Sequence, residues 1–126
     1  MIDFLGDVLA QRVPTVAQGV QHDFCWEWLA EGVLSFTPKQ AYEKAVVLSA
    51  GVHGNETAPI ELLAQLSQDL FAGALELKVK LLLILGNPNA IRTVQRYVDN
   101  DMNRMICGAY QKFTDTVEAR RVAVLE

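Results

Sequence analysis

Residues 45–57 read AVVLSAGVHGNET, a short apolar run followed by a turn that contains two glycines. The run from Ala45 to Ala50 has the length and composition of a strand that is covered on both faces. Residues 59–75 follow with apolar side chains at helical spacing, and residues 79–85 (VKLLLIL) form a second apolar run. Strand, helix and strand in this order predict a right-handed βαβ crossover in a mostly parallel sheet, and hence the α/β class.

The residues before this unit predict a helix and a hairpin. Residues 2–11 carry an apolar helical stripe that Pro14 ends. Residues 24–36 alternate in the manner of strands and are punctuated by Glu31 and Gly32, which predicts an antiparallel hairpin closing at Thr37 and Pro38.

The residues after the unit are less regular. A short helix is predicted at 90–97, and a further helix from Thr116 onward. Residues 98–108 are too polar to form core. Because two strands leave a sheet with an exposed edge and the last helical pattern lacks a C-cap, we expect residues 1–126 to be the amino-terminal part of a longer, truncated domain. Its hairpin region is 24–36 and its α/β core is 44–126.

Composition narrows the class of protein. Of 126 residues, 51% are hydrophobic and 21% charged, which is typical of one folded domain. The net charge of −4 argues against a broad surface for nucleic acid or an acidic membrane, and apolar runs of about 18 residues, as a membrane span requires, are absent from the sequence. The start lacks the cationic segment of a secretory signal, and Cys25 and Cys107 lack paired spacing. We therefore expect a cytoplasmic protein with reduced thiols, buried or incidental.

A histidine and a glutamate follow the first predicted strand, where ligand sites of α/β folds gather. Gly51 and Gly54 allow a sharp turn around His53, and Glu56 can point back toward the same place. An imidazole and a carboxylate so placed suit zinc. The alternative is that His53 is a turn residue and Glu56 a favourable charge at a helix N-terminus.

Three arginines follow the second predicted strand. Arg92, Arg96 and Arg104 fall within thirteen residues, interleaved with acidic and amide side chains. Guanidinium groups bind carboxylates through paired N–H donors, so this segment predicts an anion site beside the metal. The alternative is a solvated segment whose charges pair with one another.

Three motifs together resemble a known family. GVHGNETAP (51–59), LGNPNA (85–90) and RYVDNDMNR (96–104) are similar to the succinylglutamate desuccinylase and aspartoacylase family of zinc hydrolases, which are relatives of the metallocarboxypeptidases. The segments WEW (26–28) and GVLSFTP (32–38) look more like the desuccinylase branch. The resemblance implies a metallocarboxypeptidase-like (phosphorylase/hydrolase-like) fold.

The resemblance also implies roles for individual residues. His53 and Glu56 would bind one zinc ion per complete subunit, and Arg96 would polarise the scissile amide carbonyl. Asn103 and Arg104 would bind a substrate carboxylate.

Three further residues complete what the family implies. Asp101 would orient the loop that carries Asn103 and Arg104. The family's third zinc ligand, a histidine, and its general-base glutamate lie further along and are absent from this chain. We expect the other histidine, His22, to be a loop or surface residue.

The implied reaction is zinc-dependent hydrolysis of N-succinyl-L-glutamate to succinate and L-glutamate in arginine catabolism, with these 126 residues inactive alone. One alternative is an aspartoacylase-like deacylase of another acidic N-acyl amino acid, such as N-acetylaspartate. Another is a non-catalytic domain that binds a small dicarboxylate. The sequence leaves acyl-chain selectivity and oligomeric state open.

Overall fold

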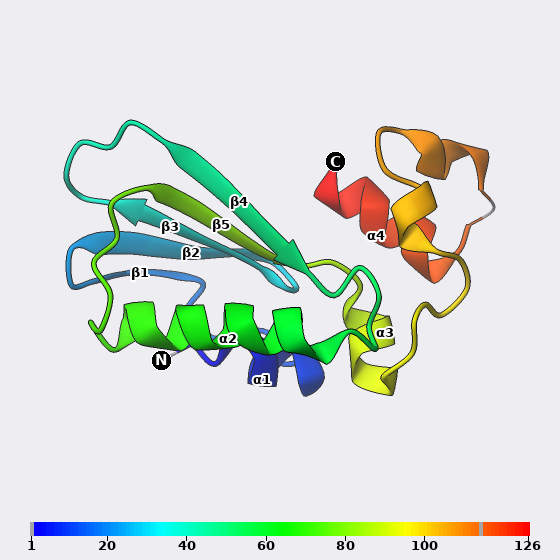
Figure 1. Cartoon of the computed structure of the whole chain (residues 1–126), viewed down its shortest axis with the longest axis horizontal. Coiled ribbons are helices and arrows are strands. Elements are labelled where there is room, and N and C mark those ends of the chain that lie inside the picture. Colours follow the sequence, from blue (N-terminus) through cyan, green and yellow to red (C-terminus); the bar gives the residue numbers. More distant parts are fainter. Residues whose placement is uncertain (1, 114) are drawn as a thin grey trace.

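The computed structural model describes residues 2–113 and 115–126. Its centre is a five-stranded sheet made of β1 (Gln18–Gln21), β2 (Phe24–Ala30), β3 (Val33–Pro38), β4 (Ala45–Ala50) and β5 (Lys80–Leu85), in the order β1-β2-β3-β5-β4. Helices α1 (Phe4–Leu9) and α2 (Thr57–Phe71) cover one face of this sheet (Figure 1).

The sheet is mixed, and most of its pairings are antiparallel. Only β4 and β5 run parallel, whereas β1–β2, β2–β3 and β3–β5 are antiparallel. The prediction of a mostly parallel sheet was therefore wrong. The reason is that the hairpin joins the same sheet, with Val33 opposite Ile84 and Phe36 opposite Leu81.

The predicted βαβ unit is confirmed as β4, α2 and β5. The two strands are in register from Ala45 opposite Lys80 to Ala50 opposite Leu85. However, β4 is the edge strand and most of its residues are exposed, so the expectation that it is covered on both faces was wrong. The inner strand β5 does bury its alternate residues Leu81, Leu83 and Leu85.

The predicted hairpin is confirmed as β2 and β3, which meet at Glu31 and Gly32. Strand β1, which the sequence did not predict, pairs with the outer side of β2. The inward residues of the hairpin meet α2 in an aromatic cluster, in which Phe36 and Phe71 have ring centroids 5.4 Å apart and Trp26 and Phe71 5.7 Å apart. This cluster fixes the far end of α2 against the sheet.

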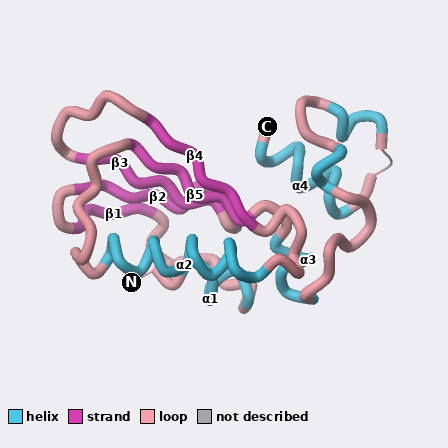
Figure 2. The backbone as a smooth tube through the Cα atoms, in the orientation of Figure 1, coloured by secondary structure: helices cyan, strands magenta, loops and turns pink. Residues whose placement is uncertain are grey.

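The other predicted helices are present but shorter. They are α1, α3 (Pro88–Thr93) and α4 (Val117–Leu125), and two 3₁₀ turns, η1 (Met102–Arg104) and η2 (Ala109–Lys112), lie between α3 and α4 (Figure 2). No helix in the described ranges is long and apolar enough to cross a membrane. Cys25 and Cys107 are free and exposed, so the buried alternative for these thiols is excluded.

A second, smaller core holds the η1–α4 part together. Met102 and Met105 are 1% and 0% exposed, and they pack with Ala119 and Val122 of α4. The prediction that residues 98–108 are too polar for core was therefore wrong for these two methionines. They lie three residues apart, which places both on one side of the turn and leaves the side chains between them outward.

Candidate active site

The site forms where β4 and β5 end. Because the strands are parallel, the turns that follow them lie side by side. The Gly86 N–H donates to the Ala50 carbonyl at 2.7 Å, and the Asn87 N–H donates to the Gly51 carbonyl at 2.9 Å. These bonds fix the turn that carries His53 beside the start of α3.

Two glycines in this turn are needed for different reasons. Gly51 has φ +73°, a left-handed conformation that residues with a Cβ rarely adopt. At Gly54 a Cβ would lie 2.2 Å from the Ala90 carbonyl carbon, and the Gly54 N–H donates to the Arg96 carbonyl at 3.2 Å. The absence of a side chain at Gly54 therefore lets the His53 turn touch α3 and the segment that begins at Arg96.

His53 and Glu56, the two predicted zinc ligands, face each other. His53 Nδ1 lies 3.3 Å from Glu56 Oε1. Glu56 is the N-cap residue of α2, and its side chain is 62% exposed, whereas that of His53 is 13% exposed. The pair thus lies at the protein surface with the imidazole held by the turn and the carboxylate open to solvent.

Asp101 approaches the other nitrogen of the same imidazole. Its Oδ1 accepts a hydrogen bond from His53 Nε2 at 3.0 Å and another from the Asn103 N–H at 3.1 Å, and its Oδ2 lies 3.9 Å from Arg96 Nη2. Burial raises the pKa of Asp101, but the hydrogen bonds from His53 and Asn103 and the charges of His53 and Arg96 outweigh it and hold that pKa below its ordinary value. Asp101 therefore does more than the sequence predicts: it also touches the histidine.

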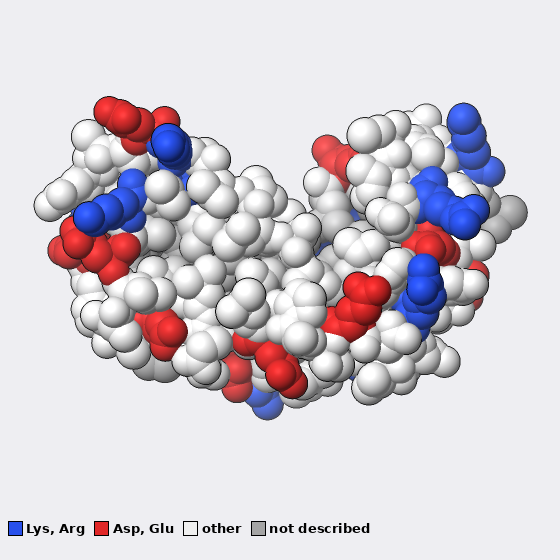
Figure 3. Space-filling view, viewed as in Figure 1, with Lys and Arg blue, Asp and Glu red and all other residues white. Residues whose placement is uncertain are grey.

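A hollow of about 380 Å³ lies next to this cluster. Its lining residues come from the segment between α3 and α4, and they are Arg96, Tyr97, Asp99, Asn100, Asp101, Arg104 and Phe113. Asn103 and Arg104 are exposed because the buried Met102 and Met105 turn them outward. Basic and acidic side chains gather over this part of the molecule, and a notch separates it from the strands (Figure 3).

The structure does not bring the third arginine, Arg92, to the site. Its guanidinium donates to the Val8 carbonyl at 2.9 Å, to the Asn89 side chain and to the Glu31 carboxylate. Arg92 thus ties α3 to α1 and to the β2–β3 turn. His22 lies in the exposed turn between β1 and β2, and its Nε2 lies 2.9 Å from the Phe71 carbonyl oxygen, which confirms the prediction of a loop residue.

Two buried charged residues of α4, which the sequence did not predict, support the site from the interior of the protein. Glu118 and Arg121 of α4 are 0% and 9% exposed. Arg121 donates to the carbonyls of Leu85 and Gly86, both at 3.0 Å, and burial lowers the pKa of its guanidinium. Charged residues three positions apart within the apolar stripe of a helix were the available signal.

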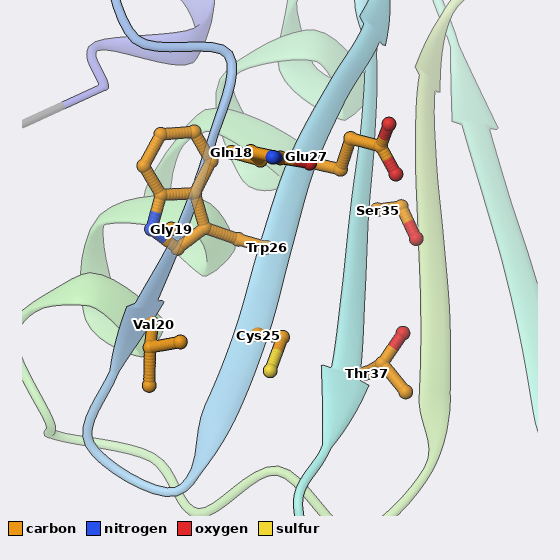
Figure 4. Close-up of a pocket in the computed structure, with 8 residues that line it drawn as sticks. All are labelled: Gln18, Gly19, Val20, Cys25, Trp26, Glu27, Ser35 and Thr37. Carbon is orange, nitrogen blue, oxygen red and sulfur yellow. The ribbon is translucent and has the colours of Figure 1, made fainter.

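Another hollow, of about 410 Å³, lies on β1, β2 and β3, away from these residues (Figure 4). Its wall includes Cys25, Glu27 and Thr37, and the Trp26 indole lies against Gly19, where a Cβ would come within 2.8 Å of the ring nitrogen. One carboxylate among thiol, hydroxyl and indole groups offers less chemistry than the histidine, carboxylates and arginines at the ends of β4 and β5.

The donor set at His53 and Glu56 fits a zinc ion. If Nε2 carries the proton that Asp101 accepts, Nδ1 of the neutral ring is an acceptor, and it faces a carboxylate oxygen, which is also an acceptor. Two ligands of one tetrahedral zinc, each about 2.1 Å from the metal, lie about 3.4 Å apart. The 3.3 Å separation of Nδ1 and Oε1 matches that span. In residues 2–113 and 115–126, no group of three His, Cys, Asp or Glu residues has the arrangement of a metal site.

Comparisons with known proteins agree with the motifs. The family model described as the succinylglutamate desuccinylase/aspartoacylase catalytic domain matches residues 42–126. A succinylglutamate desuccinylase of Yersinia pestis is 52% identical over all 126 residues, which cover 38% of that relative. The chain thus spans well under half the length of the curated relatives it matches.

Solved structures give the same result. The crystal structure of the succinylglutamate desuccinylase of Chromobacterium violaceum matches with a TM-score of 0.89 and 37% identity, over 98% of this chain and 40% of that one. The enzyme of the same name from Vibrio cholerae matches with a TM-score of 0.85 and 31% identity, over 97% and 36% of the two chains. The chain belongs to the succinylglutamate desuccinylase/aspartoacylase family, as its three motifs predict.

Proposed function

We propose that this chain supplies part of the active site of a zinc-dependent hydrolase that cleaves N-succinyl-L-glutamate into succinate and L-glutamate. The observation that carries the proposal is the approach of His53 Nδ1 to Glu56 Oε1, 3.3 Å apart beside an arginine-lined hollow. The names of the relatives, which are succinylglutamate desuccinylases, support the choice of substrate. We also propose that the reaction belongs to arginine catabolism, on the family resemblance, and that it takes place in the cytoplasm, on the free thiols of Cys25 and Cys107.

His53 and Glu56 would hold the zinc ion. A bound zinc ion supplies Lewis acidity and lowers the pKa of a bound water. Asp101 keeps the imidazole oriented, since a metal-bound histidine usually donates its other N–H to a carboxylate or carbonyl.

The arginines would handle the charges of the substrate. Arg96 is exposed and close to Asp101, so its guanidinium can reach the amide carbonyl and stabilise the negative charge that develops on its oxygen. Asn103 and Arg104 would bind a carboxylate of the substrate, since their outward side chains offer one amide and one forked set of N–H donors. Under this proposal Arg96 would assist cleavage of the amide bond, and Asn103 and Arg104 would orient the substrate.

The test is an assay on a polypeptide of the relatives' length that contains this sequence. We expect zinc-dependent release of succinate from N-succinylglutamate, loss of that release in His53→Ala, and much slower turnover of N-acetylaspartate. Faster turnover of N-acetylaspartate would instead support an aspartoacylase-like enzyme. An inactive protein without stoichiometric zinc, which still binds succinate, would contradict the proposal and favour a binding domain.

A further inference from the structure

Glu118 of α4 is a buried carboxylate that receives four hydrogen bonds. Its Oε1 accepts from the N–H groups of Asp99, at 2.6 Å, and Asn100, at 2.9 Å. Its Oε2 accepts from Asn87 Nδ2 at 2.9 Å and from the Val98 N–H at 3.3 Å. Successive backbone N–H groups directed at one anion hold a loop in a defined shape, and here the anion belongs to the protein itself.

The loop held in this way connects the proposed catalytic and substrate-binding residues. Residues 98–100 lie between Arg96 and the segment from Asp101 to Arg104. The attachment is reciprocal, because Asp99 Oδ2 accepts from the Val117 N–H at 3.0 Å and so caps the start of α4. A shift of the loop would therefore move Arg96 and Asp101 together.

The same carboxylate also reaches the turn that carries His53. Asn87 is fully buried, and while its side chain donates to Glu118, its N–H donates to the Gly51 carbonyl at 2.9 Å. Glu118 therefore links the two halves of the site: it reaches the turn after β4 through the Asn87 side chain, and it holds the loop before η1 through the backbone N–H groups of residues 98–100.

We infer that Glu118 is a positioning residue that fixes residues 98–100, so that Asp101 meets His53 and Arg104 faces the substrate. The four hydrogen bonds that Glu118 accepts come from Asn87 and residues 98–100, and not from His53, Asp101 or Arg104, so it acts through the loop. The effect on turnover that we expect below rests on the proposed function, whereas the effect on loop order can be measured without it.

The first test is amide hydrogen exchange on the 126-residue chain with Glu118→Gln. One acceptor oxygen becomes an NH₂ group among donors, so exchange at Val98, Asp99 and Asn100 should accelerate by about tenfold or more. The matched control is Glu126→Gln at the C-cap of the same helix, because the Glu126 carboxylate accepts from the N–H groups of Cys107 and Gly108. The control should change exchange at 107 and 108 only. Unchanged exchange at 98–100 in Glu118→Gln would overturn the inference.

A second variant separates positioning from general stability. Asn87→Asp combined with Glu118→Gln exchanges donor and acceptor while keeping the net charge, and should restore protection at Asp99 and Asn100. Asn87→Asp alone places two carboxylates next to each other. Its amide exchange at residues 98–100 should therefore be faster than in Glu118→Gln or in the double variant. If the double variant is no better ordered than Glu118→Gln, or if neither folds, Glu118 is a stability residue and the inference is wrong.

The functional test uses a polypeptide of the relatives' length that contains this sequence. Glu118→Gln should raise the KM for N-succinylglutamate by about tenfold, with a smaller fall in kcat, and the double variant should recover it. Glu126→Gln should leave both constants unchanged. If the unsubstituted polypeptide of that length has no activity, the result counts against the proposed function alone. If that polypeptide is active but Glu118→Gln does not change its KM, the result refutes the positioning role alone.

Discussion

His53 Nε2 lies 3.0 Å from Asp101 Oδ1, although 48 residues separate the two in the sequence. The contact joins the turn after β4 to the loop before η1 and leaves Nδ1 of the imidazole toward Glu56. One carboxylate thus orients the predicted ligand, accepts from the Asn103 N–H and lies 3.9 Å from Arg96.

Replacing this carboxylate should weaken zinc binding. We expect Asp101→Asn to reduce the zinc affinity of the chain by about 10- to 100-fold, as is typical when the partner of a metal-bound histidine is removed. Isothermal titration with zinc measures this. Asp115→Asn is the control, because Asp115 is 76% exposed and pairs only with Arg120, at 3.2 Å, among the described ion pairs. Equal affinities for the two variants would show that Asp101 does not support the metal.

Two of the three arginines that follow β5 should respond differently to replacement by lysine. Arg104→Lys should raise the KM for N-succinylglutamate in a polypeptide of the relatives' length and leave the melting temperature unchanged, because Arg104 is exposed beside the hollow. Arg92→Lys should lower the free energy of unfolding by about 1–2 kcal/mol and leave KM unchanged, because Arg92 holds the Val8 carbonyl and Glu31. The reverse pattern would place the substrate at Arg92.

Glycine at position 54 should be far harder to replace than glycine at 108. A Cβ at Gly54 meets backbone atoms of Ala90 and Ile91 at 2.2–2.4 Å, so Gly54→Ala should cost about 3 kcal/mol. Gly108 has φ +79° but open space around it, and Gly108→Ala should cost about 1 kcal/mol. Urea unfolding of both variants measures the difference. Similar costs would mean that the close contact between the His53 turn and α3 does not form.

Val94 is strained where α3 ends. It has φ +52°, a left-handed conformation that is costly for a β-branched residue and that glycine adopts freely at helix ends. Val94→Gly should therefore raise the free energy of unfolding by about 1 kcal/mol. Val124→Gly is a matched control, because both valines are 62% exposed and Val124 lies within α4. The control should lose about 0.5 kcal/mol. A loss in both variants would refute the strain.

Much of the fold could be predicted from local patterns. The apolar run 79–85 and the helical stripe after Pro59 each have one physical interpretation, and together they give the βαβ unit. The turn at 51–57 follows its strand directly, which places His53 and Glu56 at the strand end. The family motifs indicate that the segment 96–104 belongs to the same site.

What could not be predicted depends on contacts between distant segments. Strand β1 reads QGVQ, too short and polar to be identified without its partner β2. The antiparallel pairing of β3 with β5 leaves little trace in either sequence, and an apolar run such as 45–50 does not reveal that it lies at an edge. Glu118 is charged and would be assigned to the surface, and only the four donors around it explain its burial.

The most direct test of the account is a zinc titration of the chain followed by NMR of the histidine ring nitrogens. The chain has two histidines, so His22 serves as an internal reference. We expect zinc to shift the Nδ1 resonance of His53 and not that of His22, and Glu56→Gln to weaken binding at least about tenfold, as loss of one of two ligands requires. Exposed Glu61 offers the control, since Glu61→Gln should change nothing. Zinc binding that leaves His53 unshifted, or that survives Glu56→Gln unchanged, would contradict the account.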